Sequence, residues 1–89
     1  MAPPNRIKMH IVVRFHSYFK ELTGCEECNE TLDDGCSLAA LHENLMVKFP
    51  KLAPMRKSTL LAVGVDYQRR DYVLQEGDEV SLFPPVQGG

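Results

Sequence analysis

The sequence predicts an α+β fold in which a four- to five-stranded mixed sheet packs on one main helix. Apolar residues alternate with other residues from Ile7 to Phe15 and again from Glu79 to Phe83, and a period of two is typical of half-buried strands. Between them, Leu38–Phe49 carries apolar residues at helical spacing. One amphipathic helix covers one face of such a sheet, so we expect a two-layer domain.

Length and composition indicate one small domain. A chain of 89 residues holds one modest core, which favours a carrier, an adaptor or a subunit over a self-contained enzyme. The balance of 12 acidic and 10 basic residues argues against a nucleic-acid binder. No apolar stretch reaches the about 20 residues of a membrane span, and residues 1–5 do not resemble a secretory signal. An odd count of three cysteines favours the reducing cytoplasm.

The N-terminal half is predicted to contain two strands joined by a short helix. Ile7–Phe15 is the first strand, and Ser17 is the candidate N-cap of a short helix that Gly24 ends. Glu27–Leu32 is the second strand, and a turn at residues 33–35 follows it.

The main helix, Leu38–Phe49, has Ser37 as its candidate N-cap and Pro50 as its stop. After it we expect a basic connector, a strand, a polar excursion, a short strand, a turn and a last strand. In chain order these are Lys51–Ser58, Leu60–Val65, Asp66–Asp71, Tyr72–Leu74, Gln75–Asp78 and Glu79–Phe83.

This order of elements is that of the β-grasp pattern, although periodicity alone predicts only the α+β class. The expected organisation is a flexible N-terminus at residues 1–5, one β-grasp domain at residues 6–85 and an extended C-terminal tail at residues 86–89.

The C-terminal segment is the strongest candidate for chemistry. Pro84 and Pro85 stiffen the exit from the last strand, and the four residues after them span up to about 13 Å when extended. Gly88 and Gly89 have no side chains, so the backbone can thread a narrow channel and the terminal carboxylate is unhindered. We therefore predict that the Gly89 carboxylate is activated and presented inside another protein. The alternative is a terminus without function.

The cysteines and histidines form no complete metal or catalytic motif. Cys25 and Cys28 have the spacing of a zinc knuckle or a redox pair, but a zinc site would also need Cys36 and His42 across a helix start. We expect the cysteines to be ordinary loop or strand residues and expect no metal site. The three histidines are expected at the surface: His10, His16 and His42.

The charges are unevenly distributed along the chain. Seven acids and no base lie between Glu21 and Glu43, whereas four bases and no acid lie between Asn44 and Val65. Two solvated faces explain this pattern, and steering toward charged partners is the alternative. Three acids near the tail could meet a basic patch on an activating enzyme: Glu76, Asp78 and Glu79.

From about Lys8 to Gly89 the chain resembles the small, sulfur-carrying subunits of molybdopterin synthase. The most specific match is the combination of GDEV at 77–80 and FPPVQGG at 83–89, and shorter matches are FKELTG at 19–24 and DGCSL at 34–38. The chain departs from the family at its three cysteines, which are not family hallmarks, and at Gly64, where members often have Asn.

The resemblance implies a ubiquitin-like β-grasp fold and a cycle of sulfur transfer. An E1-like enzyme would use ATP and magnesium to adenylate Gly89, and a sulfurtransferase system would convert the adenylate to a thiocarboxylate. The tail would then enter the large synthase subunit and donate sulfur to the dithiolene of molybdopterin.

In that cycle the chain would not be catalytic alone and would bind no cofactor itself. The implied assembly is a cytoplasmic heterotetramer of two small and two large subunits. Apolar anchors are common at such interfaces, although Phe83 could instead belong partly to the core. The expected partner-binding residues are Phe83, Pro84, Pro85, Val86 and Gln87.

Other functions stay open from the sequence. One is a carrier for another sulfur pathway, such as thiamine synthesis, tRNA thiolation or a specialised metabolite, although the Phe-Pro-Pro element favours molybdopterin over thiamine. Another is a ubiquitin-like modifier joined to lysines through Gly89. The last is a β-grasp interaction module with an inert terminus.

Overall fold

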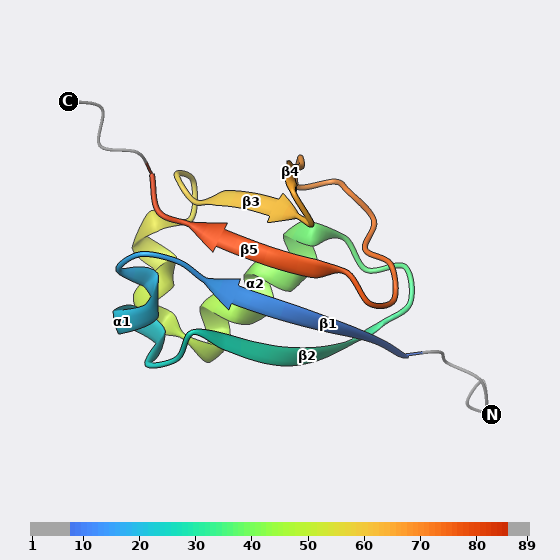
Figure 1. The fold of residues 1–89 in the computed structure, drawn as a ribbon, viewed down its shortest axis with the longest axis horizontal. Helices are drawn as coiled ribbons and strands as arrows, with labels where there is room; N and C mark the ends of the chain where they lie inside the picture. Colours follow the sequence, from blue (N-terminus) through green and yellow to red (C-terminus); the bar gives the residue numbers. More distant parts are fainter. Residues whose placement is uncertain (1–7, 86–89) are drawn as a thin grey trace.

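The computed structural model describes residues 8–85, which form a sheet lying across one main helix (Figure 1). The expectations for residues 1–5 and 86–89 lie outside the described residues. The strands are β1 (Lys8–Phe15), β2 (Glu27–Asp33), β3 (Leu60–Val63), β4 (Asp66–Tyr67) and β5 (Glu79–Phe83). The helices are α1 (Phe19–Thr23), α2 (Leu38–Lys48) and the 3-10 helix η1 (Pro50–Met55). In this part of the chain no helix is long and apolar enough to cross a membrane.

The strands form one mixed sheet in the order β2-β1-β5-β3-β4. β1 and β5 lie side by side and run parallel, whereas the other three pairs are antiparallel. The register aligns Val13 with Val80 and Phe15 with Leu82. The end of β1, the start of β2 and the end of β5 therefore meet at one end of the sheet (Figure 1). The predicted α+β class, with a five-stranded mixed sheet on one main helix, is confirmed.

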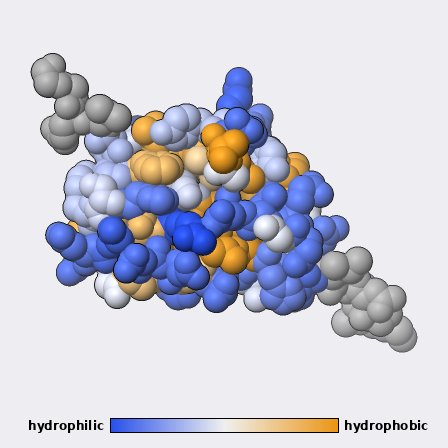
Figure 2. Space-filling view, in the orientation of Figure 1, coloured by the Kyte–Doolittle hydropathy of each residue, from blue (hydrophilic) through white to orange (hydrophobic). Residues whose placement is uncertain are grey.

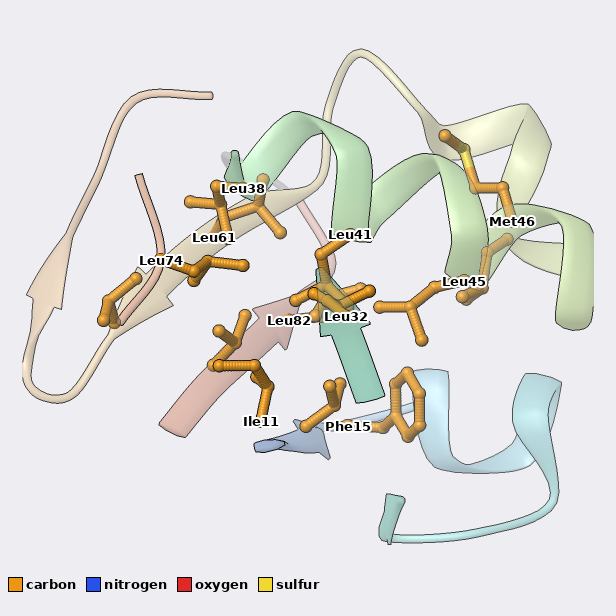
Figure 3. Close-up of a cluster of buried hydrophobic side chains, with 14 of the residues drawn as sticks. Ile11, Phe15, Leu32, Leu38, Leu41, Leu45, Met46, Leu61, Leu74 and Leu82 are labelled. Atoms are coloured by element: carbon orange, nitrogen blue, oxygen red, sulfur yellow. The ribbon is translucent and has the colours of Figure 1, made fainter. Parts of the chain in front are cut away.

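The core lies between α2 and the inner face of the sheet (Figure 3). In β1, alternate residues from Met9 to Phe15 are buried, so the residues between them face outward. In α2, Leu38, Leu41 and Leu45 are fully buried against this face. The other core side chains come from α2 itself, from every remaining element except β4, and from the loop before β5: Phe19, Leu32, Met46, Leu52, Leu61, Val63, Leu74, Val80 and Leu82.

Short-range signals set most of the helix ends. The Ser37 hydroxyl accepts a hydrogen bond from the N–H of Ala40 at 3.1 Å, and Gly24 ends α1 with a φ of 79°, so both predicted caps are confirmed. The prediction for Ser17 is wrong, because Tyr18 is the N-cap and no side chain caps α1. Ser17 makes the reversal out of β1 with a φ of 58°, whereas a capping residue needs an extended backbone.

The segments that follow α2 are more structured than predicted. The connector predicted at residues 51–58 contains most of η1, in which Leu52 is fully buried. The strand predicted at residues 60–65 ends at Val63, and Gly64 turns the chain into β4 with a φ of 63°. The polar segment predicted at residues 66–71 therefore begins with a strand. The sequence does not indicate this strand, because both residues of β4 are exposed and no apolar residue alternates with them.

Residues 72–74, predicted as a short strand, form only an isolated bridge between Val73 and Ser37. The first turn of α2 has N–H groups without intrahelical partners, and this loop supplies acceptors for them. The N–H of Leu38, for example, donates to the Tyr72 carbonyl at 2.8 Å. The loop is thus ordered by the helix start and not by a neighbouring strand.

His42 corrects a further prediction, because it is fully buried and not at the surface. A guanidinium can only donate, so the Arg70 side chain donates to Nδ1 of His42 at 2.6 Å and the neutral ring carries its proton on Nε2. That Nε2 is buried without a partner among the described residues. Burial, and then the Arg70 charge, lower the pKa of His42 to about 4. No local pattern marks this contact, which joins residues 28 positions apart.

Truncation of Leu45 tests the packing of α2. We expect Leu45→Ala to lower the free energy of unfolding by about 2–5 kcal/mol, because it removes a fully buried side chain and leaves a cavity. Urea denaturation followed by circular dichroism measures the change. Val47 lies on the same helix and is 80% exposed, so Val47→Ala should change it by less than about 0.5 kcal/mol. Equal losses for the two variants would contradict the orientation of α2.

Acid should weaken the fold through His42. Because the folded-state pKa of about 4 lies below the ordinary value of 6.5, the unfolded chain binds the proton first as the pH falls. The contribution of this group to the free energy of unfolding should be constant above pH 6.5 and decline between pH 6.5 and 4. Urea titrations across this range, with His42→Gln as the comparison, measure that decline. The same decline in His42→Gln would assign it to other groups.

Candidate functional site

The last strand leads directly into the predicted functional segment. β5 stops at Phe83, and the partly buried Pro84 and Pro85 follow it. Proline has no N–H to donate, so the ladder cannot continue, and the predicted end of the sheet is confirmed. Four predicted site residues lie outside the described residues: Val86, Gln87, Gly88 and Gly89. The described part of the candidate site is the surface around the end of β5.

Phe83 lies on the outer face of the sheet, away from α2. Its neighbour Leu82 is fully buried on the inner face, whereas Phe83 is only partly buried. The Phe83 ring stacks on the His16 ring with centroids 4.3 Å apart, and it meets the Tyr67 ring edge-on at 6.0 Å. Leu60 lies opposite Phe83 in the β3–β5 register. We call these four residues, from three strands and the end of β1, the aromatic patch.

The aromatic patch is the apolar part of a mostly polar face. Tyr67 is 67% exposed and Leu60 is 36% exposed. Figure 2 shows hydrophobic surface near the end of β5 and the start of β3, and hydrophilic surface over much of β1 and β2. Between these regions Arg14 pairs with Glu79 and, at 3.7 Å, with Glu27. A partly exposed cluster of aromatic and apolar side chains bordered by charges is typical of a protein contact surface.

The three acids near the tail are engaged within the chain. Glu79 pairs with a cation of β1, and Oε1 of Glu76 accepts a hydrogen bond from the N–H of His10 at 2.9 Å. Oδ2 of Asp78 accepts from the N–H of Gln75 at 2.8 Å, which helps to close the predicted turn before β5. Their contact with an activating enzyme stays a prediction.

The cysteines are free thiols that pack, partly buried, against the core: Cys25, Cys28 and Cys36. Within residues 8–85, no group of three His, Cys, Asp or Glu side chains is placed to hold a metal ion. The Cys28 thiol lies 3.7 Å from Oε2 of Glu30, and the same oxygen accepts a hydrogen bond from Lys48 at 2.8 Å. Burial, and then the Glu30 charge, raise the pKa of Cys28 to about 11.

The sequence predicts only the contiguous part of this surface, residues 83–85, and does not predict the other members of the aromatic patch. The alternation of apolar and polar residues along β1 and β5 does predict part of the patch, namely which side chains face outward. Leu82 faces the core, so Phe83 must face outward, and His16 continues the polar side of β1. These patterns do not predict the order of the strands in the sheet. They therefore do not predict that Leu60 and Tyr67 lie next to Phe83.

The fold and site together define the class of protein. A mixed sheet in which the first and last strands pair in parallel, packed on the helix that follows the first hairpin, is the ubiquitin-like β-grasp. Residues 13–89 match the ThiS family, and the chain belongs to this family. The match runs through the aromatic patch to the C-terminal glycines.

Relatives and solved structures agree with this assignment. The chain is 33% identical over 81 residues to the molybdopterin synthase sulfur carrier subunit of Escherichia coli (strain K12), covering 89% of this chain and 99% of that protein. A putative molybdopterin converting factor subunit 1 from Pyrococcus furiosus has a similar structure, with a TM-score of 0.80 and 26% identity over 88% of this chain and 99% of that one.

A chain in the protein-protein complex of subunits 1 and 2 of the molybdopterin-converting factor from Helicobacter pylori is also similar. Its TM-score is 0.65 and its identity 26%, over 91% of this chain and 100% of that one.

Proposed function

We propose that the chain is a sulfur carrier and the small subunit of a molybdopterin synthase, with Gly89 as the group that carries the sulfur. The observation that carries this proposal is membership of the ThiS family over a match that includes the C-terminal glycines. The sulfur carrier subunit of Escherichia coli supports it. The geometry adds that the chain leaves β5 beside an exposed aromatic patch.

The chemistry we propose takes place at the Gly89 carboxylate. A carboxylate is a poor electrophile, so an E1-like enzyme first uses ATP and magnesium to form the acyl-adenylate, whose leaving group is AMP. A sulfurtransferase system then replaces AMP with sulfur and leaves a thiocarboxylate. The thiocarboxylate donates its sulfur to the dithiolene of molybdopterin, and water restores the carboxylate.

The aromatic patch is the proposed contact with the large subunit. Aromatic side chains supply large contact areas at little entropic cost, and they dominate the energetics of many interfaces. Pro84 and Pro85 restrict the backbone after β5, and the four residues beyond them span up to about 13 Å. Docking at the patch would therefore deliver Gly89 to a site within that reach. The Helicobacter pylori complex of subunits 1 and 2 supports a partner of this kind.

Removal of Gly89 tests the carrier. We expect the Gly89 deletion to abolish sulfur transfer and to leave the free energy of unfolding within about 0.5 kcal/mol of the intact chain. Intact mass after incubation with ATP, an E1-like enzyme and a sulfur source should show one oxygen replaced by sulfur only in the intact chain. Val65→Ala, at a residue that is 98% exposed, is the control and should be converted normally. A truncated chain that still supports molybdopterin synthesis would overturn the proposal.

Truncation within the aromatic patch tests the docking surface. We expect Tyr67→Ala and Phe83→Ala each to raise the Kd for the large subunit about tenfold or more, because each removes an aromatic contact of roughly 1.4 kcal/mol or more. Isothermal titration calorimetry measures the Kd. Thr31→Ala is the matched control, since Thr31 is exposed on the same face opposite His10 in β1. An equal effect of Thr31→Ala would show that the patch is not the contact.

A further inference from the structure

β2 forms one edge of the sheet, and in the described part of the chain it pairs only with β1 (Figure 1). The opposite edge is β4, which has two residues, whereas β2 has seven. β2 contains no proline or glycine, and its register with β1 runs without a bulge from Glu27 to Asp33. The backbone of β2 is therefore regular enough to pair with a further strand on its outer side.

The alternation of hydrogen bonds along β2 identifies the backbone groups that point outward. Opposite residues of an antiparallel pair alternately exchange two backbone hydrogen bonds and none. The N–H of Phe15 donates to the Glu26 carbonyl at 2.9 Å, so even-numbered residues bond to β1 and odd-numbered residues of β2 point away from it. The N–H and C=O groups of Glu27, Asn29 and Thr31 therefore point outward. All three residues are exposed, and these groups have no hydrogen-bond partner within the described part of the chain. We call these groups the free edge.

Acidic side chains surround the free edge. Residues 26–34 contain five acids and no base, and Figure 2 shows hydrophilic surface over much of β2. Three of the acids form ion pairs with cations of β1 or α2: Glu27, Glu30 and Asp33. Glu26 lies just before β2 and Asp34 just after it, and both are exposed. Neither has an ion-pair partner among residues 8–85, so an acidic excess remains at both ends of the free edge.

The same acids disfavour a second copy of this chain at the free edge. The antiparallel register that overlaps all seven residues of two β2 strands would place Glu27 of each copy opposite Asp33 of the other. It would also place the two copies of Glu30 opposite each other. Like charges directly opposite each other destabilise a pair of strands. A segment with lysine or arginine at alternate positions would instead meet these acids with opposite charges.

We propose that the free edge binds an extended segment of a partner protein, rich in lysine or arginine, which adds to the sheet as a further strand. Backbone hydrogen bonds to Glu27, Asn29 and Thr31 supply the pairing, and the surrounding acids select a basic segment over an acidic one. β1 separates β2 from β5, so the free edge shares no residue with the aromatic patch. The inference does not depend on the proposed function, because it uses neither the aromatic patch nor the C-terminal glycines.

The first experiment presents simple probe peptides to the full chain. The probe is a short peptide of alternating lysine and valine with acetylated and amidated ends, and a peptide of alternating glutamate and valine is its matched control. NMR spectra of the isotope-labelled chain report on binding at each backbone N–H. We expect the lysine probe to bind with a Kd below about 1 mM and the glutamate probe to bind at least about tenfold more weakly.

The position of the signal changes identifies the surface that binds. The amide signals of Glu27, Asn29 and Thr31 should shift most, because their N–H groups gain acceptors. Those of Cys28 and Glu30 should shift less, because their N–H groups already bond to β1.

Methylation of the probe tests strand addition without altering the protein. In an added strand, one alternate set of probe nitrogens faces β2 and the other set faces away. A methylated nitrogen cannot donate, so methylation of the set that faces β2 should raise the Kd about tenfold or more. Methylation of the other set is the matched control and should change the Kd by less than about threefold. Equal effects of the two methylated probes would show that the probe does not bind as a strand.

Substitution of the unpaired acids tests the charge selection. We expect Glu26→Gln combined with Asp34→Asn to raise the Kd of the lysine probe about threefold or more. Asp66→Asn combined with Asp71→Asn makes the same change in net charge at and after β4, the opposite edge of the sheet, and should leave the Kd within about twofold. Equal weakening by the two double variants would assign the attraction to net charge alone and contradict the proposed site.

Three further results would overturn the inference. The first is no binding of the lysine probe, and the second is a set of shifts centred on the aromatic patch and not on β2. The third is a dimer of the chain without any probe, detected by sedimentation, in which the same β2 signals are shifted. That result would make a second copy the occupant of the free edge.

Discussion

The parallel pairing of β1 with β5 is the constraint on which the rest of the structure depends. It brings the two ends of the described chain into the middle of one sheet, with Val80 and Leu82 fully buried beneath. It also places Phe83 beside His16, so the aromatic patch exists only when this pair has formed. The root of the tail therefore belongs to the most protected part of the fold, and loosening it would require opening the core.

The two faces of this sheet differ in the side chains that they carry and in what those side chains contact. The inner face carries the apolar residues that α2 covers, and its contacts determine whether the chain folds. The outer face carries the aromatic patch beside paired charges. Because alternate residues of a strand point in opposite directions, β5 stabilises the core through Leu82 and carries Phe83 on the outer face. The proposed contact residue Phe83 thus lies on a strand of the sheet, and a preformed surface of this kind would limit the ordering cost of docking.

Much of the fold is predictable because its signals are local. Alternation marks β1 and β5, helical spacing marks α2, and Ser37 and Gly24 mark helix ends. The errors arise where distant parts of the chain determine the outcome. The buried His42 bonds to Arg70, a loop residue 28 positions away, and β4 forms because Gly64 returns an exposed segment to the sheet edge.

The same distinction applies to the site. The contiguous Phe-Pro-Pro segment is visible in the sequence, whereas the aromatic patch needs strand order, because its members come from distant positions: His16, Leu60, Tyr67 and Phe83. The pairing of Cys28 with Lys48 through one oxygen of Glu30 is likewise tertiary, since it joins β2 to the end of α2.

Because β1 and β5 run parallel, the chain enters the sheet at one end and leaves it at the other. The eight residues of β1 separate these ends by about 26 Å, at roughly 3.3 Å per residue. A label or a surface linkage joined ahead of β1 would thus lie at the end of the sheet opposite to the one where β5 stops. Such a label could be a fluorescent protein or an affinity handle. Attachment after β5 would instead add bulk at the segment that the proposed function requires to enter the large subunit. The geometry makes the N-terminal side the natural point for immobilising or labelling this molecule.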